Sequence, residues 1–245
     1  MKKNILILLI LAFPISMNVN AQKSYLGFSL GTSIPMGDLA SSNDLFTNGY
    51  AIPGFTVFFE GYYFPVPVIG IGGALTFGSL YADSDVYLED LIEYAYTQSE
   101  IPMFGDPPMK EEVGLESGFW NYVNLMVGPE LSVPFGPFQA AVHGLAGITF
   151  GFYPKREFYY AEGLNTLEIL AKGSSAAFAY SVGGSLLYKG RSGTGIKVST
   201  DYLTSKVSYD LNMDVLNNSV EYDLNKPSEV DIEALSITIG FFYVF

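Results

Sequence analysis

An alternation of bulky apolar residues with small or polar ones constrains this chain more than any other feature. In the last segment, Ile237, Ile239 and Phe241 alternate with Thr238 and Gly240. Successive side chains of a β-strand point to opposite faces, so each such segment predicts a strand with one apolar face. Eight segments of this kind lie at about residues 26–31, 55–60, 69–78, 122–133, 139–152, 180–189, 196–202 and 236–245. The alternation therefore predicts an all-β fold.

The connections between these segments alternate in length. Three are tight turns, around residues 65–67, 134–136 and 190–193, and four are long, at about residues 35–50, 82–117, 154–175 and 210–232. Long connections are uncommon in compact domains, whereas a membrane β-barrel combines short periplasmic turns with long extracellular loops. We therefore expect an eight-stranded antiparallel up-and-down transmembrane β-barrel with both termini in the periplasm.

The first 21 residues have the pattern of an export signal. Lys2 and Lys3 precede an apolar stretch from Ile5 to Ile15, and Val19-Asn20-Ala21 places small residues before a cleavage site. The apolar stretch is shorter than the roughly 20 residues that a membrane-spanning helix needs, and no later apolar run reaches that length. The expected domains are a signal peptide at residues 1–21 and a barrel at residues 22–245.

Charge is scarce in this chain and mostly acidic. Charged residues make up 15% of it, with 12 Lys and Arg against 25 Asp and Glu. Residues 82–117 contain ten acidic side chains and one lysine, and residues 210–233 contain seven and one, so the expected strands are left almost uncharged. The acidic balance argues against a nucleic-acid partner, which needs a basic surface. The absence of cysteine excludes thiolate metal sites and a cysteine nucleophile.

Motifs at both ends of the mature chain resemble a known family. The C-terminus alternates at Phe241, Tyr243 and Phe245, and residues 31–38 read Gly-Thr-Ser-Ile-Pro-Met-Gly-Asp ahead of a Gly-Tyr-Ala at 49–51. These motifs resemble the small Gram-negative outer-membrane β-barrel family of OmpX/OmpA-like and PorT-like proteins. The resemblance implies an outer-membrane location, contact with lipids including lipopolysaccharide, and recognition of the C-terminal aromatic residues by the barrel-assembly machinery.

Five ionisable side chains fall on the inward faces of the expected strands, namely Glu60, Glu130, His143, Lys197 and Asp201. A turn at residues 134–136 places Gly128 opposite His143 and makes Glu130 a diagonal neighbour of the imidazole. Buried charges need partners, and eight strands leave an interior just wide enough for side chains. We therefore expect a paired polar network in the lumen. The alternative is a narrow path for ions or protons, because many inward positions are Gly, Ala or Ser.

The sequence does not support an enzyme. His143 is the only histidine, and Gly144 and Leu145 follow it, so the His-x-Ser arrangement of outer-membrane deacylases is missing. A serine nucleophile would lack a base elsewhere in the chain. The acidic clusters have no D-x-D-x-D-G calcium spacing. No catalytic residue, cofactor or metal site is expected.

Helical spacing occurs within two of the expected loops. Leu88, Leu91, Ile92 and Ala95 share one face and predict a short amphipathic helix, and residues 166–172 predict a second helical turn before Gly173. The function that we expect is a non-enzymatic outer-membrane barrel with a structural or surface-binding role, acting through acidic extracellular loops. The alternatives are a narrow channel for ions or small solutes and, as the resemblance implies, a PorT-like component associated with secretion.

Overall fold

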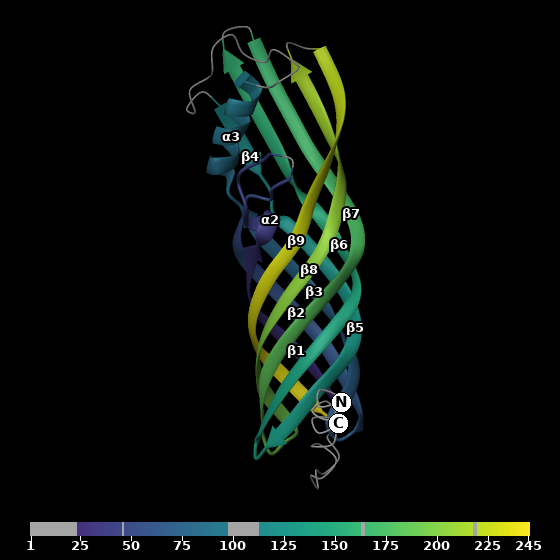
Figure 1. The fold of residues 1–245 in the computed structure, drawn as a ribbon. Coiled ribbons are helices and arrows are strands. Elements are labelled where there is room, and N and C mark those ends of the chain that lie inside the picture. The colour runs from purple at the N-terminus through teal and green to yellow at the C-terminus, as the bar shows by residue number, and fades with distance from the viewer. Residues whose placement is uncertain (1–23, 46, 98–112, 163–164, 218–219) are drawn as a thin grey trace, which may run out of the picture.

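A closed ring of eight strands forms the body of the protein. The computed structural model describes residues 24–45, 47–97, 113–162, 165–217 and 220–245. Its elements are β1 (Tyr25–Met36), α2 (Gly37–Ala40), β2 (Ala51–Val66), β3 (Ile69–Ala82), α3 (Ser84–Thr97), β4 (Val113–Ser117), β5 (Trp120–Phe135), β6 (Phe138–Glu162), β7 (Asn165–Lys189), β8 (Thr194–Asn217) and β9 (Val220–Val244). All strands except β4 pair antiparallel around the ring, and the β6–β7 and β1–β9 pairings close it (Figure 1). The expected eight-stranded up-and-down barrel is confirmed.

The wall of the barrel is apolar outside and small or polar inside. On β9, Ile237, Ile239 and Phe241 are exposed, whereas Ser236 and Thr238 between them are buried. Exposed apolar side chains recur around the ring, among them Phe28, Phe59, Leu75, Leu125, Ile148, Phe178, Val182 and Val198. A closed backbone ring with an apolar outer belt is the form in which a β-sheet spans a membrane. The chain is therefore an outer-membrane-type β-barrel.

Three short turns define one end of the barrel, which we call the turn end. They join β2 to β3, β5 to β6 and β7 to β8 (Figure 1). The two ends of the described chain also meet there, because the backbone N–H of Phe245 donates to the carbonyl of Ser24 at 2.9 Å. The signal peptide expected at residues 1–21 lies outside the described residues.

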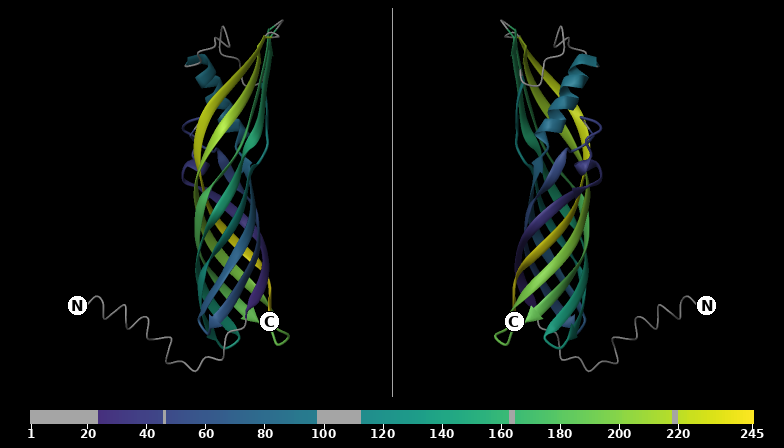
Figure 2. Two further views of the ribbon diagram at one scale, coloured as in Figure 1. Left: turned by 90° about the vertical axis from the view of Figure 1, so that its right-hand side faces the viewer. Right: turned by 90° about the vertical axis from the view of Figure 1, so that its left-hand side faces the viewer.

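The opposite end, which we call the arm end, is built by strands that continue beyond the ring (Figure 2). The β6–β7 pairing runs to Glu162 and Asn165, and the β8–β9 pairing runs to Asn217 and Val220. The expectation that residues 154–175 and 210–232 are loops is therefore wrong, and the helical turn expected at 166–172 belongs to β7. Cross-strand pairing satisfies the backbone in these segments.

The arm end also carries helices α2 and α3 and the short strand β4, which lies outside the ring. Helix α3 includes Leu88, Leu91, Ile92 and Ala95, so the expected amphipathic helix is confirmed. Strand β4 pairs with residues 156–160 of β6 and lies beside α3 (Figure 1). Among the described residues, no helix has the length and apolar character needed to cross a bilayer.

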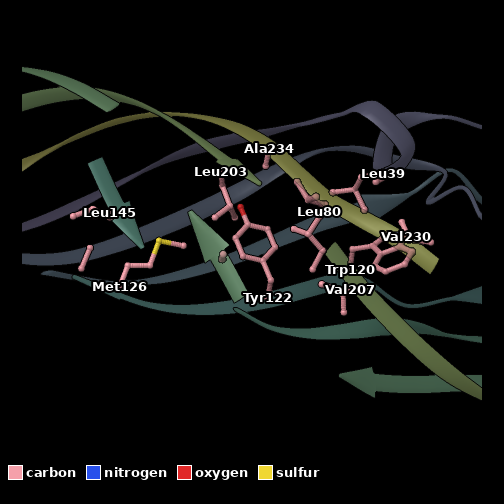
Figure 3. Packing of buried hydrophobic residues seen from close by; sticks show 14 of the residues in the cluster. Leu39, Leu80, Trp120, Tyr122, Met126, Leu145, Leu203, Val207, Val230 and Ala234 are labelled. Atoms are coloured by element: carbon pink, nitrogen blue, oxygen red, sulfur yellow. The ribbon is translucent and has the colours of Figure 1, made fainter. Parts of the chain in front are cut away.

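The interior of the barrel is filled by side chains along its length. Figure 3 shows Met126 and Leu145 at one side of this cluster and Trp120, Val207 and Val230 at the other. Trp120 and Val207 are both 1% exposed. The lumen is thus a packed core in the parts that these residues occupy.

Candidate functional site

The five ionisable residues expected in the lumen come from four strands and all point inward. Glu60 lies on β2, Glu130 on β5, His143 on β6, and Lys197 and Asp201 on β8. The most exposed of the five, Glu60, has only 8% of its surface accessible. The structure therefore brings all five expected residues into the buried interior.

Two pairs of ionisable side chains meet in the lumen. The ammonium of Lys197 donates to Oε1 of Glu60, and Nε2 of His143 lies 2.6 Å from Oδ1 of Asp201. Both pairs join side chains that are far apart in the sequence: Lys197 and Glu60 come from β8 and β2, and His143 and Asp201 lie on either side of Gly183 of β7. A buried carboxylate is expensive without a partner, so each pair compensates the desolvation of its own members.

Glu130 connects to a tyrosine and to the histidine. The hydroxyl of Tyr25 donates to Oε2 of Glu130 at 2.9 Å, and Oε2 lies 4.0 Å from Nδ1 of His143. Glu130 is directly opposite His143 in the β5–β6 pairing, so the expected pairing of Gly128 with His143 is wrong. The turn is one residue further along than the sequence suggested, with Phe135 opposite Phe138 and Gly136 at φ 66°.

Glycines make room for these pairs. A Cβ at Gly183 would lie 2.1 Å from Oδ1 of Asp201 and 2.6 Å from Nε2 of His143. A Cβ at Gly27 would lie 3.0 Å from Oε1 of Glu60. The small residues on the inner face therefore provide the space that the charged side chains fill.

A small cavity lies next to this network, lined by apolar side chains such as Tyr122, Met126 and Leu145 as well as by polar ones. Its volume is about 10 Å³, and its lining includes Thr76, Asn124, Ser181, Asp201 and Ser236. That space is close to the smallest that holds one water molecule. The cavity is therefore suited to an ordered water on Asp201 and is too small for a solute.

The arm end of the lumen is closed by different residues, centred on Arg156. The guanidinium is 2% exposed, and its Nη2 donates to the carbonyl of Gly49 at 3.2 Å. The indole Nε1 of Trp120 donates to the same carbonyl at 2.7 Å. Two donors from the wall thus hold one backbone oxygen of the segment that precedes β2, and we call this segment, residues 41–50, the cap.

Aromatic rings surround the Arg156 guanidinium. Its Cζ lies 3.6 Å from the ring centre of Tyr87 on α3 and 5.1 Å from that of Tyr153, whose hydroxyl accepts from Nη1 at 2.7 Å. Faces of aromatic rings attract a cation, most strongly when water is excluded. Sequence reasoning missed Arg156 because residues 154–175 were assigned to a loop. The sequence feature that could have indicated a role for Arg156 is its position at the start of residues 156–160, which are rich in aromatic side chains.

The cap is also tied to α3. The hydroxyl of Tyr50 donates to Oδ2 of Asp90 at 2.5 Å, and Leu45, Tyr50 and Tyr87 form a buried cluster. Burial, reinforced by the hydrogen bond to the Asp90 carboxylate, raises the pKa of Tyr50 well above its ordinary value. The Tyr50 hydroxyl therefore remains a donor throughout the neutral pH range.

Of the three residues expected to form an assembly signal, Phe241 and Tyr243 lie on the outer face of β9, and Phe245 follows its last residue. Phe241, Tyr243 and Phe245 are 70%, 54% and 61% exposed. They face away from the lumen at the turn end. Their recognition by the insertion machinery remains a prediction.

Among the described residues, no His, Asp and Glu side chains gather in a way that could hold a metal ion. No family model matches the sequence, and no curated protein matches it. Solved structures of several outer-membrane proteins are similar to this chain at low sequence identity. OprG from Pseudomonas aeruginosa is 12% identical over 93% of this chain and 97% of its own, with a TM-score of 0.48. AlkL, solved in lipid bilayers, is 14% identical over 94% and 93%, with a TM-score of 0.41.

A third similar structure is Ail, the attachment invasion locus protein of Yersinia pestis. It is 12% identical over 91% of this chain and 100% of its own, with a TM-score of 0.37. The assignment of this chain as an outer-membrane β-barrel rests on its own closed ring and apolar belt. Two features of the lumen bear on the role of the protein, namely the buried ionisable residues toward the turn end and the cap at the arm end.

Proposed function

We propose that this outer-membrane barrel is a closed, non-conducting protein that acts by binding at its arm end. The observation that carries this proposal is the Lys197–Glu60 pair, which spans the lumen with both side chains buried. An ion that passed this point would have to separate the two charges. The cap held by Trp120 and Arg156 adds a second closure at the other end.

The proposal includes an orientation and the absence of catalysis. The turn end, with both chain ends, faces the periplasm, and the arms of β6–β9 with their acidic residues face outward, which is the usual arrangement of bacterial barrels. The only histidine, His143, contacts Asp201 and lies beside Glu130, and in the described part of the chain no hydrogen bond joins it to a serine. The lipid contacts and the assembly machinery expected from the sequence are the other proposed partners.

A narrow channel is the second candidate. The cavity beside Asp201 favours it, because Thr76, Asn124 and Ser236 contribute polar groups to a space about the size of one water molecule. The two candidates differ in one property, which is whether the wild-type lumen carries current.

Conductance of the purified protein in planar bilayers tests the proposal. We expect no single-channel steps from the wild type. The double variant Glu60→Ala/Lys197→Ala removes the pair without leaving an unpaired charge, and it serves as the control for an opened lumen. Steady single-channel currents from the wild type would overturn the proposal in favour of the channel.

A further inference from the structure

The seam between β7 and β8 is interrupted close to the arm end. The two strands pair from Lys189–Gly195 to Ala179–Ser205, and they pair again from Lys172–Asn212 outward. Residues 173–178 and 206–211 are unpaired across this seam, and we call this interval the seam gap. It extends over about 20 Å at the usual rise per residue of a strand.

The seam gap is a local separation and not a loss of structure. Residues 173–178 remain paired with β6, and residues 206–211 remain paired with β9. The register of β7 and β8 is the same on both sides of the gap, so the strands part and return without a slip. The backbone ladder between β7 and β8 is therefore interrupted over this interval, and the Ser205 hydroxyl donates to the carbonyl of Phe178 at 3.1 Å across its lower edge.

The side chains at the seam gap leave it thinly covered. On β7 they are small, from Gly173 through Ser175 to Ala177, and these inward positions are half-buried. Phe178 and Tyr180, at the lower edge of the gap, are exposed and belong to the apolar belt. The seam gap thus begins where the apolar outer belt of the barrel ends. This boundary corresponds to the membrane–water interface, where amphipathic molecules lie.

Aromatic side chains lie directly behind the seam gap. Tyr209 on β8 is 1% exposed, and its ring centre lies 5.9 Å from that of Trp120 and 6.0 Å from that of Tyr153. A Cβ at Gly151 on β6 would lie 2.3 Å from the Tyr209 hydroxyl. The Tyr209 side chain therefore reaches past β7 and covers the gap from within. Figure 3 shows Val207, also on this face, beside Trp120.

Two buried polar atoms in this region have no hydrogen-bond partner, the hydroxyl of Tyr209 and Nε of Arg156. Arg156 connects to the aromatic residues through Tyr153, and it is paired with Ala171 of β7, just beyond the gap. The hydrogen bonds of the guanidinium in the described structure go to neutral oxygens. A buried guanidinium is best satisfied by an anion such as a carboxylate.

We propose that the seam gap admits an alkyl carboxylate, with its chain against the aromatic residues behind the gap and its carboxylate on Arg156. This inference rests on the proposed binding role of the arm end and names its ligand class. The Tyr209 hydroxyl supplies a second donor to the carboxylate. The source of the ligand is a free fatty acid, because an acyl chain esterified in a lipid has no carboxylate to offer.

Intrinsic fluorescence gives a direct test, since Trp120 is the only tryptophan. The probes are dodecanoate with bromine at mid-chain, the matching brominated alcohol, and bilayers of phosphatidylcholine with brominated acyl chains. We expect saturable quenching of Trp120 by the acid and binding of the alcohol that is about tenfold weaker, as for a lost charged hydrogen bond. Equal affinity for acid and alcohol, quenching by the phospholipid alone, or no saturable quenching would overturn the proposal.

Two variants separate ligand contact from stability. Tyr209→Phe removes a hydroxyl without a partner, so the unfolding temperature should stay the same while the acid binds several-fold more weakly. Arg156→Gln should weaken binding of the acid about tenfold and leave binding of the alcohol unchanged. Unchanged binding of the acid by Tyr209→Phe together with Arg156→Gln would contradict the site even if the wild type were quenched.

The seam gap itself is testable with cysteine pairs, because the chain has no cysteine of its own. Ala176→Cys/Ser208→Cys spans the gap, and Leu186→Cys/Val198→Cys spans a paired part of the same seam. Disulfides need Cα atoms within about 7 Å. We expect the control pair to oxidise and the gap pair to stay reduced, and ready oxidation of the gap pair would remove the opening on which the proposal depends. Bilayer currents from the wild type would instead refute the closed lumen.

Discussion

At the turn end the lumen is closed by charges that meet in pairs, whereas at the arm end it is closed by aromatic rings around one guanidinium. Near Lys197 the pairing of β8 with β7 is continuous, and the β5–β6 ladder beside His143 skips only Gly128 and Pro129. The cap is a short segment held by the Gly49 carbonyl and by the contacts of Tyr50 with α3, and the interrupted β7–β8 seam lies at the same end. We infer that the half of the barrel at the turn end is rigid and that the half at the arm end can open.

The largest expected difference concerns Lys197. Lys197→Met leaves Glu60 buried without its partner, so we expect the free energy of unfolding to fall by about 3–5 kcal/mol. The matched control is Lys206→Met, because Lys206 lies 3.7 Å from Asp231 with an exposed side chain and should contribute at most about 1 kcal/mol. Heat-induced unfolding in detergent measures both. Equal effects of the two variants would remove the special role of the turn half.

A smaller effect is expected at Gly183. Its alanine variant places a methyl group against Asp201 and His143, and we expect a loss of about 1–3 kcal/mol as the pair is forced apart. Gly144→Ala is the control on a neighbouring strand, since a Cβ there meets nothing within 4 Å. The same unfolding measurement compares them. A Gly183→Ala barrel as stable as Gly144→Ala would show that the His143–Asp201 pair is loosely held.

The smallest effect is expected at the cap. Trp120→Phe removes one of two donors to the Gly49 carbonyl, which is worth about 1 kcal/mol, and the ring contacts are retained in part. We expect faster proteolysis within residues 41–50 and little change in the unfolding temperature of the barrel. Phe119→Leu, at an exposed neighbouring position, is the control. A large drop in unfolding temperature without faster proteolysis would mean that the two halves are not separate.

The barrel was predictable because its outer faces are consistently apolar. On β9 the alternation from Ile237 to Phe241 fixes which side chains face outward, because a shift of the strand by one residue would turn every bulky side chain inward. The arms were not predictable in this way. Beyond the belt the outward positions are no longer apolar, as at Lys206, Ser208 and Asp210, so the apolar outer face on which the strand prediction relied is missing there. The pairing of these residues with β9 is set by the hairpin.

The five lumen residues were likewise predictable from alternation, whereas their pairing was not. The position of the β5–β6 turn had to be known within one residue to place Glu130 opposite His143. Arg156 and the cap depend on contacts between segments far apart in the sequence, from Gly49 to Tyr153, which no local pattern records. The alternation therefore predicts which side chains point inward. Which of them contact one another depends on the register of the strands in the closed ring.

The central claim is the contrast between a rigid turn half and an interrupted seam at the arm half, and hydrogen exchange of backbone amides tests it most directly. Amides held in a continuous ladder exchange only when the ladder opens. We expect residues 183–189 and 195–201 to be strongly protected and the seam-facing amides of residues 173–178 and 206–211 to exchange far faster. Equal and strong protection along the whole β7–β8 seam would contradict the account.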